Sequence, residues 1–366
     1  MKIEILRDHL DRAVSTAAKV SNKQLSLPVL GCAVFVATKE RAVLRATNLD
    51  VSVEVVLKAK VITEGVAAVP AHVLAQTVAA FSDQKLTIEA KETTLKVVGE
   101  RGKSSIATID ASEFPTLPYV KEGEGVAVRI PSKELGALLK NVSFAAATSS
   151  MRPELASVSL SLDGGELIAA ATDSFRLAEA RIRTKERAAF GPALIPARNV
   201  PEIVRCIEFG AETDIRVAET QITCVTDHGF ITSRTIDGAF PDYRGLVPKE
   251  FSATATVLRE DVVRAFRKVQ IFADAFNQVH ITVDPVAHRF SIQSSNAAVG
   301  ETDEDIPASV EGEQIAMNFN AKYITDALSV MGGDSTSFAI AGPGKPMVLK
   351  DTPNRGFMYL VMPMNR

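Results

Sequence analysis

The residue types that usually carry catalysis or bind metals are sparse in this chain. Its 366 residues include five histidines and three cysteines, and none of them stands in the CxxC or HExxH spacing that holds a metal ion. Residues 342–346, Gly-Pro-Gly-Lys-Pro, lack the Ser or Thr with which a phosphate-binding loop holds magnesium, so we interpret them as a hairpin turn. The sequence nominates no catalytic group, metal or cofactor, and on these residues alone an active site stays open.

The overall charge is close to neutral, with 41 Lys and Arg against 44 Asp and Glu, a formal balance of −3. Such a chain is not a globally basic nucleic-acid binder, so any contact with DNA must come from local segregation of charge. No apolar run is long enough to span a membrane, and the N-terminus carries charge where a signal peptide is apolar. Cys32, Cys206 and Cys224 lie far apart, as expected for reduced thiols. We therefore expect a cytoplasmic protein without membrane contact.

Basic side chains recur on three segments with helical spacing, 8–20, 132–147 and 259–272. In each segment, apolar residues stand three and four positions apart and acidic residues fall in the first turn. If equivalent helices face one space, their cations would attract a polyanion without reading its sequence. The alternative is that these are the solvated faces of amphipathic helices. The cations that we assign to a DNA-facing surface, on these helices, on a second set of helices and in adjoining loops, are Arg12, Lys19, Lys23, Lys140, Arg152, Arg198, Arg205, Arg264, Arg267 and Lys268.

These segments belong to a threefold internal repeat. A strand entering a helix, a strand ending in a small polar tripeptide, and a strand leading into a second helix recur in the same order at a spacing of about 125 residues. The three anchors occupy residues 5–10, 130–135 and 257–262; 46–48, 171–173 and 294–296; and 69–71, 195–197 and 318–320. We predict three tandem domains over residues 1–122, 123–249 and 250–366, with boundaries in polar, turn-prone stretches.

Each copy is predicted to be α+β, with two helices covering one face of an antiparallel sheet. The alternation in residues 158–171, with Asp163-Gly164-Gly165 at the turn, indicates a hairpin of half-buried strands. The chain ends in an apolar, Met-rich stretch, 357–366. This stretch is either the last strand closing the third sheet or an adaptable surface for varied partners.

Five motifs resemble those of the bacterial DNA polymerase III beta subunit family, the sliding clamps, along essentially the whole chain. They are LPVLG at 27–31, ATDSFRL at 171–177, DGAFPDYR at 237–244, FNAKY at 319–323 and VMPM at 361–364. The resemblance implies three clamp domains and a head-to-tail homodimer whose six domains form a closed ring around duplex DNA, with the helices inside. It implies a processivity factor that is not itself an enzyme, slides without sequence specificity and tethers the replicative polymerase. A clamp loader, other polymerases and repair proteins with clamp-binding motifs would be further partners.

The resemblance also implies a peptide groove between the second and third domains, where partners insert a short apolar motif. Phe175 replaces the His common in the family motif, and Gly245 stands where a basic residue often follows Tyr-Arg. Both departures should make the groove more apolar, so the preference for partner motifs stays open. The matching positions are Leu155, Thr172, Phe175, Arg176, Leu177, Pro241, Leu246, Asn320, Tyr323, Met347, Leu360, Met362, Pro363 and Met364.

For the dimer contact, the family pairs a strand edge of the first domain with one of the third. Ile106 would face Ile271 and Phe272, and basic residues would face acidic ones, which fixes polarity more than it supplies affinity. A solvated acidic loop is the alternative for these acids. The matching positions are Arg101, Lys103, Ser104, Ile106, Ile271, Phe272, Glu301, Asp303 and Glu304, with Asp305 beside them.

Two other functions stay open at this point. The net charge, and Pro153-Glu154 after Arg152 where some family members have aromatic residues, would suit a clamp-like scaffold that binds proteins without encircling DNA. Contacts to DNA in that loop cannot be transferred from the family. An unrecognised enzyme has scattered acids and histidines in its favour, and it would require a deep pocket of converging titratable groups.

Overall fold

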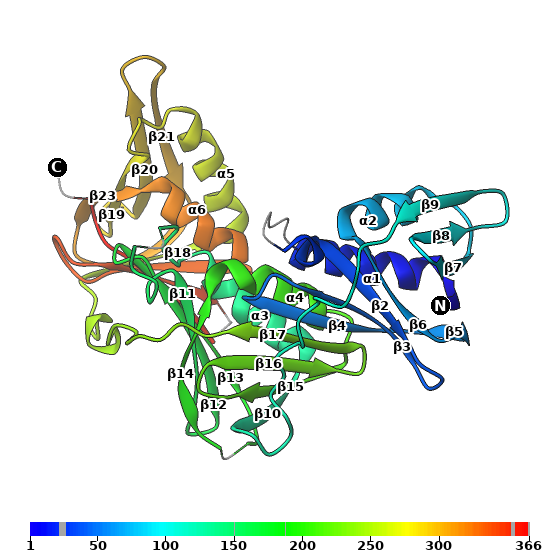
Figure 1. Ribbon diagram of the computed structural model, residues 1–366. Coiled ribbons are helices and arrows are strands. Elements are labelled where there is room, and N and C mark those ends of the chain that lie inside the picture. Colours follow the sequence, from blue (N-terminus) through cyan, green and yellow to red (C-terminus); the bar gives the residue numbers. More distant parts are fainter. Residues whose placement is uncertain (22–26, 150, 187, 353–355, 365–366) are drawn as a thin grey trace. The chain divides into compact units, whose positions relative to one another are not determined.

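The computed structural model of the chain describes residues 1–21, 27–149, 151–186, 188–352 and 356–364. These residues fold into two compact units (Figure 1). The first unit comprises Met1–Gly136 with Arg198–Thr235, and the second comprises Ala137–Ala197 with Ile236–Arg366. Helix α3 (Ser132–Ser143) begins in the first unit and ends in the second.

The first unit contains an eight-stranded and a five-stranded antiparallel sheet. Its helices are α1 (Arg7–Val20), α2 (Ala71–Ala80) and α4 (Val200–Ile207), with short turns of helix at η1 (Pro28–Gly31) and η2 (Ala197–Asn199). The larger sheet has the order β10 (Val126–Pro131), β15 (Glu212–Val217), β16 (Gln221–Thr226), β17 (Gly229–Arg234), β4 (Val51–Leu57), β3 (Ala42–Thr47), β2 (Cys32–Ala37) and β6 (Gly65–Pro70). The smaller sheet has the order β5 (Ala59–Thr63), β1 (Lys2–Leu6), β7 (Lys85–Lys91), β8 (Thr94–Val98) and β9 (Lys103–Ala107).

The second unit contains a nine-stranded and a four-stranded antiparallel sheet. Its further helices are α5 (Arg259–Ile271) and α6 (Ala321–Val330), with a short turn at η3 (Arg244–Leu246). The larger sheet has the order β14 (Phe190–Pro196), β11 (Ser157–Asp163), β12 (Glu166–Thr172), β13 (Arg176–Arg183), β26 (Phe357–Val361), β25 (Met347–Thr352), β24 (Ser335–Ile340), β18 (Ala253–Leu258) and β22 (Ala308–Gly312). The smaller sheet has the order β21 (Gly300–Ile306), β20 (Arg289–Asn296), β19 (Gln278–Asp284) and β23 (Ile315–Asn320).

The two larger sheets repeat one strand order. The run β6-β2-β3-β4-β17-β16-β15-β10 in the first unit matches β14-β11-β12-β13-β26-β25-β24-β18 in the second. In each sheet, strands from one sequence repeat pair with strands from the next, β4 with β17 and β13 with β26. The compact units therefore cut across the tandem repeats, and the boundaries 1–122, 123–249 and 250–366 remain a prediction.

The predicted first helices form directly after a strand, as the sequence indicates. In α1, the buried residues Leu10, Val14 and Ala17 follow helical spacing, while Arg12 and Lys19 are exposed. The structure provides no side-chain cap at Leu6, but acidic Asp8 lies in the first turn, where the helix dipole favours a negative charge. The same pattern holds in α5, which buries an apolar face and carries acids in its first turn. Burial of each large aliphatic side chain contributes about 1.5–3 kcal/mol to this packing.

The predicted turns are also confirmed. Strands β11 and β12 pair with Asp163 opposite Glu166, and Gly164 and Gly165 between them have φ of 56° and 78°. Two successive positive φ values are what a tight hairpin of this type requires, and glycine adopts them without steric cost. Residues 342–346 connect the paired strands β24 and β25. The Gly-Lys segment is therefore a hairpin connection.

Candidate peptide-binding surface and basic helices

An apolar cluster lies on one face of the larger sheet in the second unit. Leu177 of β13, Leu360 of β26 and Val348 of β25 are at most 5% exposed. Leu177 pairs with Leu360, and Leu360 with Val348, so the three side chains form a row across adjacent strands. We call this row the Leu177 cluster; the partly buried side chains packed against it are Tyr243, Val247, Phe251 and Met358.

Exposed apolar side chains flank the same strands. Phe175 is 62% exposed, Leu246 66% and Met362 39%. The backbone N–H of Met362 donates to the carbonyl of Phe175 at 2.8 Å, so the C-terminal segment runs beside the β12–β13 turn. Exposed apolar groups beside an apolar cluster are the chemistry that an apolar peptide segment would bind.

The turn between β12 and β13 is fixed by short-range hydrogen bonds. The Thr172 hydroxyl donates to the Arg176 carbonyl at 2.6 Å. Asp173 Oδ1 accepts the backbone N–H groups of Phe175 and Arg176 at 2.9 and 3.0 Å. Ser174 has φ of 78°, in the left-handed region. This arrangement leaves the Phe175 side chain in solvent and directs Arg176 inward.

Arg176 connects this turn to helix α6. Its guanidinium donates from Nε to Asp173 Oδ2 at 2.9 Å and from Nη1 to Asp326 Oδ2 at 2.8 Å, and its side chain is only 8% exposed. The guanidinium also lies 4.4 Å from the ring centroid of Tyr323 and 5.7 Å from that of Phe144. Burial alone would lower the pKa of Arg176, but the Asp326 hydrogen bond and the two carboxylate charges raise it above its ordinary value. Arg176 is therefore a fixed cation beneath the exposed Phe175.

The structure gives the predicted groove residues different environments. Leu155 and Met347 are buried, with 4% and 0% exposure, so they support the surface and do not form it. Asn320 accepts the N–H of Tyr323 at 3.3 Å as the N-cap of α6. The Met364 N–H donates to the Asn318 carbonyl at 2.8 Å, which holds the end of the described chain against β23. Pro241 and Pro363 are partly buried.

Sequence reasoning missed several residues of this region. Tyr243 donates its hydroxyl hydrogen to Glu179 Oε2, while Arg181 Nε donates to Glu179 Oε1 at 2.7 Å. Burial and the Glu179 hydrogen bond raise the pKa of Tyr243 above its ordinary value. Tyr243 and Asp173 lie inside quoted motifs and could have been selected from them. Asp326 and Val348 carried no sequence signal, because only folding brings them to Arg176 and Leu360.

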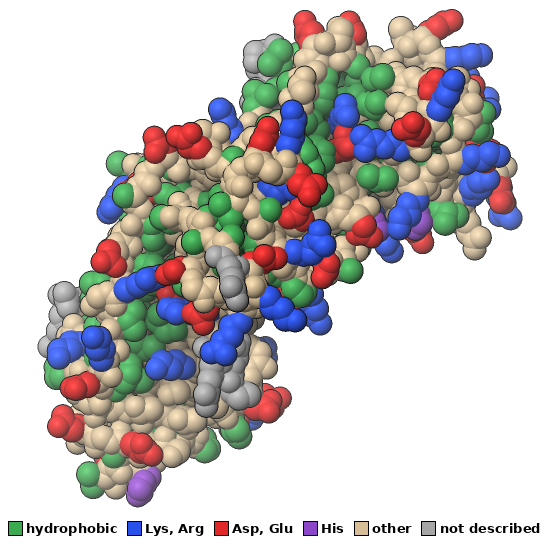
Figure 2. Space-filling model, turned by 90° about the horizontal axis from the view of Figure 1, so that it is seen from below, with side chains coloured by type: hydrophobic (Ala, Val, Ile, Leu, Met, Phe, Trp, Pro, Cys, Tyr) green, Lys and Arg blue, Asp and Glu red, His purple; other side chains and the backbone are tan. Residues whose placement is uncertain are grey.

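The cations assigned to a DNA-facing surface are exposed or partly exposed wherever they are described. Arg12 and Lys19 lie on α1, Lys140 on α3, and Arg264, Arg267 and Lys268 on α5. Arg205 lies on α4, Arg198 in η2 and Arg152 in a turn, whereas Lys23 lies outside the described residues. Among the described residues on the face in Figure 2, basic side chains are interspersed with acidic ones.

Intramolecular ion pairs divide these cations into two groups. Five are paired with acids of their own unit: Arg152 with Glu154, Arg198 with Asp50, Arg205 with Glu202, Arg264 with Asp261 and Lys268 with Glu304. Within the described part of the chain, no ion pair involves Arg12, Lys19, Lys140 or Arg267. Arg12 lies 5.1 Å from the ring centroid of Phe209. The second group is free to bind a phosphate without first breaking an ion pair.

Most residues assigned to a dimer contact lie on two edge strands, whereas Arg101 precedes one of these strands, Ile271 is the last residue of α5 and Phe272 follows it. Strand β9, with Lys103, Ser104 and Ile106, is the last strand of the five-stranded sheet, and β21, with Glu301, Asp303 and Glu304, is the last strand of the four-stranded sheet. Exposed edges can pair with another chain.

The side chains assigned to this contact differ in how exposed they are and in whether they already form ion pairs within the chain. Ile106 is 6% exposed, so it has little surface left for a partner, whereas Ile271 is 64% exposed. Lys268 binds Glu304, and Arg289 binds Asp303 and Asp305 within the chain. Arg101 and Lys103 are exposed, as is Glu301, and Phe272 and Ser104 are partly buried.

Three further observations limit the chemistry of the described residues. They contain no cluster of three or more His, Cys, Asp or Glu side chains placed to hold a metal ion. No described helix is both long and apolar enough to cross a membrane. Burial raises the pKa of the Cys206 thiol to about 12, so this thiol stays protonated at neutral pH.

Comparison with known proteins assigns the chain to one family. The N-terminal, central and C-terminal domains of the DNA polymerase III beta subunit match residues 1–118, 129–242 and 244–365. The beta sliding clamp of Caulobacter vibrioides is 27% identical over 374 residues, covering 100% of both chains, and that of Bacillus subtilis is 26% identical, covering 100% of this chain and 99% of the relative.

Solved structures agree in fold. The DNA polymerase III beta subunit of Thermotoga maritima has a TM-score of 0.93 at 22% identity, over 100% of this chain and 99% of that one. A DNA polymerase sliding clamp of Pseudomonas aeruginosa with a ligand has a TM-score of 0.88 at 26% identity, over 100% of both chains. The three tandem domains expected from the repeat and the clamp fold that the resemblance implies are confirmed, and this chain belongs to the DNA polymerase III beta subunit family of sliding clamps.

Proposed function

We propose that this chain is a non-catalytic processivity factor of DNA polymerase III. Two copies form a closed head-to-tail ring that encircles duplex DNA, slides along it without sequence specificity and tethers the replicative polymerase. Membership in the sliding-clamp family supports the clamp role, and DNA and a polymerase are the partners that this membership implies. The clamp loader and repair proteins with clamp-binding motifs are further proposed partners, and the location is the bacterial cytoplasm at the nucleoid.

The observation that carries the proposal is the recurrence of cationic first helices in a threefold repeat. Helices α1, α3 and α5 each bear at least one exposed cation, Lys19, Lys140 and Arg267, without an ion pair among the described residues. Such cations attract phosphates independently of base sequence. Enclosure by a ring removes the need for tight binding, and weak contacts allow sliding.

Protein partners are proposed to bind at the exposed residues around the Leu177 cluster. Phe175, Leu246 and Met362 provide the apolar surface, and Arg176 fixes the turn that presents Phe175. Loss of the last five residues, 362–366, removes Met362 and its backbone hydrogen bond to Phe175. This truncation should abolish binding of an apolar clamp-motif peptide, measured by fluorescence anisotropy, without changing the dimer mass. Unchanged peptide affinity would place the site elsewhere.

The ring is proposed to close by pairing of β9 of one copy with β21 of the other. Both are edge strands, and the basic residues Arg101 and Lys103 complement the acidic β21. Because most β21 acids already have partners within the chain, the ionic contribution should be small and the strand pairing the main attraction. Sedimentation at micromolar concentration should give the mass of a dimer.

The decisive experiment is retention on DNA of different topology. Supplied with its clamp loader and ATP, the protein should stay on nicked circular DNA during gel filtration and run off after the circle is linearised. Equal retention on both forms would indicate ordinary binding. Retention on neither form would favour the alternative, a clamp-like scaffold that binds proteins and does not encircle DNA.

A further inference from the structure

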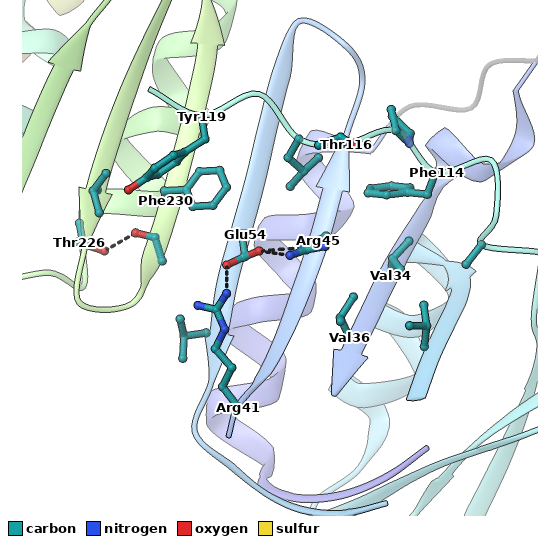
Figure 3. A pocket seen from close by; sticks show the side chains of 17 residues that line it. Val34, Val36, Arg41, Arg45, Glu54, Phe114, Thr116, Tyr119, Thr226 and Phe230 are labelled. Atoms are coloured by element: carbon teal, nitrogen blue, oxygen red, sulfur yellow. Dashed lines mark hydrogen bonds and ion pairs between the residues drawn. The ribbon is translucent and has the colours of Figure 1, made fainter. Parts of the chain in front are cut away.

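A hollow of about 700 Å³ lies on one face of the larger sheet in the first unit (Figure 3). Its residues come from six neighbouring strands, from Val66 on β6 through β2, β3, β4 and β17 to Val225 on β16. Six strands about 4.8 Å apart span about 24 Å, which is the length of about seven extended residues. The volume lies within the range of ligand-binding pockets, about 300–1,000 Å³.

The floor of this hollow carries an unequal set of charges. Glu54 of β4 has a side chain only 7% exposed, and it pairs with Arg45 Nη2 at 2.7 Å and Arg41 Nη2 at 3.7 Å. Arg45 Nε also donates to Glu54 Oε2 at 2.8 Å. The side chains of Arg41 and Arg45 remain 59% and 35% exposed. Two guanidinium groups thus share one carboxylate, and the lining retains one excess positive charge.

The walls of the hollow are largely apolar. Segment 111–119 crosses over the strands, and its Phe114 packs on a buried cluster that includes Val34. At the other end, the Tyr119 ring meets the Phe230 ring edge-on at a centroid distance of 4.7 Å. Figure 3 shows Val34, Val36 and Phe114 on one side of the Arg–Glu group and Tyr119 with Phe230 on the other. The lining thus combines cationic groups with apolar walls.

The equivalent position of the second unit carries different side chains. Register places Glu179 of β13 where β4 has Glu54, because Thr47 pairs with Ser52 as Thr172 pairs with Leu177. In the second unit, Tyr243 from segment 237–247 reaches down and donates to Glu179. The strand partner of Glu179 is Ala170, whereas the partner of Glu54 is Arg45. The first unit therefore combines a second arginine with an open space, a combination that the repeat does not require.

We propose that this hollow binds an extended peptide segment of a partner protein in which an Asp or Glu side chain neighbours large apolar side chains. The carboxylate would accept hydrogen bonds from the exposed N–H groups of Arg41 and Arg45, and the apolar side chains would cover the Val36 and Phe114 wall. The excess guanidinium charge favours an acidic segment over a neutral or basic one. This site is separate from the surface around the Leu177 cluster, and its existence does not depend on DNA encirclement.

The test is a selection of random heptapeptides displayed on phage against the full-length protein, with counter-selection against a V66E variant. Val66 is 56% exposed on the hollow's edge, so the new carboxylate would repel an acidic peptide without disturbing the core. We expect enriched peptides with an acid beside apolar residues. A labelled synthetic copy should bind R41Q about tenfold more weakly than the native protein in fluorescence anisotropy, since one charge-assisted hydrogen bond is lost.

Matched controls keep the result interpretable. K39Q removes the same charge from an exposed residue that shares the turn of Arg41 but does not line the hollow, and it should leave peptide affinity unchanged. Truncation of residues 362–366 should also leave it unchanged. The proposal is overturned if no peptide discriminates V66E, if selected peptides lack an acid, or if R41Q binds as tightly as the native protein. Displacement by octanoate at the peptide's own affinity would overturn the peptide occupant in favour of a small carboxylate.

Discussion

The two units place different side chains on the same backbone. Thr47 and Thr172 begin equivalent turns, Asn48 and Asp173 accept equivalent backbone N–H groups, and the next residue in each turn has positive φ. The three positions of the Leu177 cluster correspond by strand register to Ser52, Thr232 and Thr223 in the first unit.

Those hydroxyl groups satisfy one another and the backbone. The hydroxyl oxygens of Thr223 and Thr232 lie 2.8 Å apart, as do those of Thr47 and Ser52. The backbone N–H of Val120 donates to the Thr223 hydroxyl oxygen at 3.1 Å. The first unit thus fills with internal hydrogen bonds the position where the second unit has an apolar cluster. A repeat specifies a fold, whereas the chemistry of a surface depends on a few positions that the repeat leaves free.

The largest expected effect comes from exchanging the two chemistries. Leu177→Ser puts the hydroxyl of the first unit into the apolar cluster of the second, where Leu360 and Val348 supply no hydrogen-bonding group and only Thr172, the counterpart of Thr47, has a hydroxyl nearby. The loss of buried aliphatic surface and the burial of a hydroxyl should lower the free energy of unfolding by about 3–5 kcal/mol. Urea unfolding followed by circular dichroism measures this change. Leu246→Ser, at a 66% exposed position, should change it by less than about 0.5 kcal/mol. Similar effects at both positions would show that the Leu177 cluster contributes no special stability.

The next prediction concerns the pH dependence of stability, to which buried thiols contribute in the first unit only. All three cysteines lie in the first unit, and burial, with the nearby Cys206 thiol and Asp214 charge, raises the pKa of Cys224 to about 12. An unfolded thiol ionises from about pH 8.5, so the stability that protonation provides is complete below that value and decreases as pH rises toward 12.

Between pH 8 and pH 10, the free energy of unfolding should therefore fall by about 2 kcal/mol for each such thiol. Cys224→Ala should reduce this fall by that amount, whatever its effect at pH 8. Urea unfolding at the two pH values measures it. An equal pH dependence in the variant and the native protein would contradict the buried-thiol account.

A smaller effect tests the contact of Tyr243 with Glu179, at the position of the second unit that corresponds to Glu54 in the hollow. Tyr243→Phe removes the hydrogen bond to Glu179 but keeps the ring in place, and it should lower the free energy of unfolding by about 1 kcal/mol. Tyr243→Ala also removes the ring. Even so, the acidic heptapeptide should still bind only to the first unit, because Ala170, the strand partner of Glu179, supplies no second cation. Calorimetric titration of both variants with the heptapeptide, with R41Q as the reference, measures the number of peptides bound per chain. A second bound peptide in Tyr243→Ala would show that removal of the ring is enough to create a site.

Much of this architecture could be predicted because it depends on local patterns. The threefold repeat, the helices at 8–20 and 259–272 and the Gly164-Gly165 hairpin follow from apolar spacing and turn chemistry. The sheets that join β4 to β17 and β13 to β26 were not predicted, because such pairing joins residues more than 170 positions apart and leaves no local signal.

The site was predictable to a lesser extent. Phe175, Leu177 and Leu360 lie in recognisable motifs, but the partners of Arg176 and Glu54 depend on long-range contacts. For the same reason, the charge of a helix did not indicate which of its cations are free. Arg267 and Lys268 are neighbours on α5, yet Lys268 Nζ contacts Glu304 at 2.8 Å, and no described ion pair involves Arg267.

The smallest expected effect uses this pair of neighbours. If α5 faces duplex DNA, Arg267→Gln should remove one phosphate contact and reduce the slope of log K against log salt by about 0.9. Lys268→Gln removes the same charge but also frees Glu304, so the local charge near DNA becomes more negative while no established phosphate contact is lost. Its effect on the salt slope should therefore be smaller than that of Arg267→Gln. The binding constant for short duplex DNA, measured at salt concentrations from about 20 to about 200 mM, distinguishes the slopes of the two variants. Equal slopes for both variants would mean that the intramolecular ion pair does not decide which cations meet the phosphates.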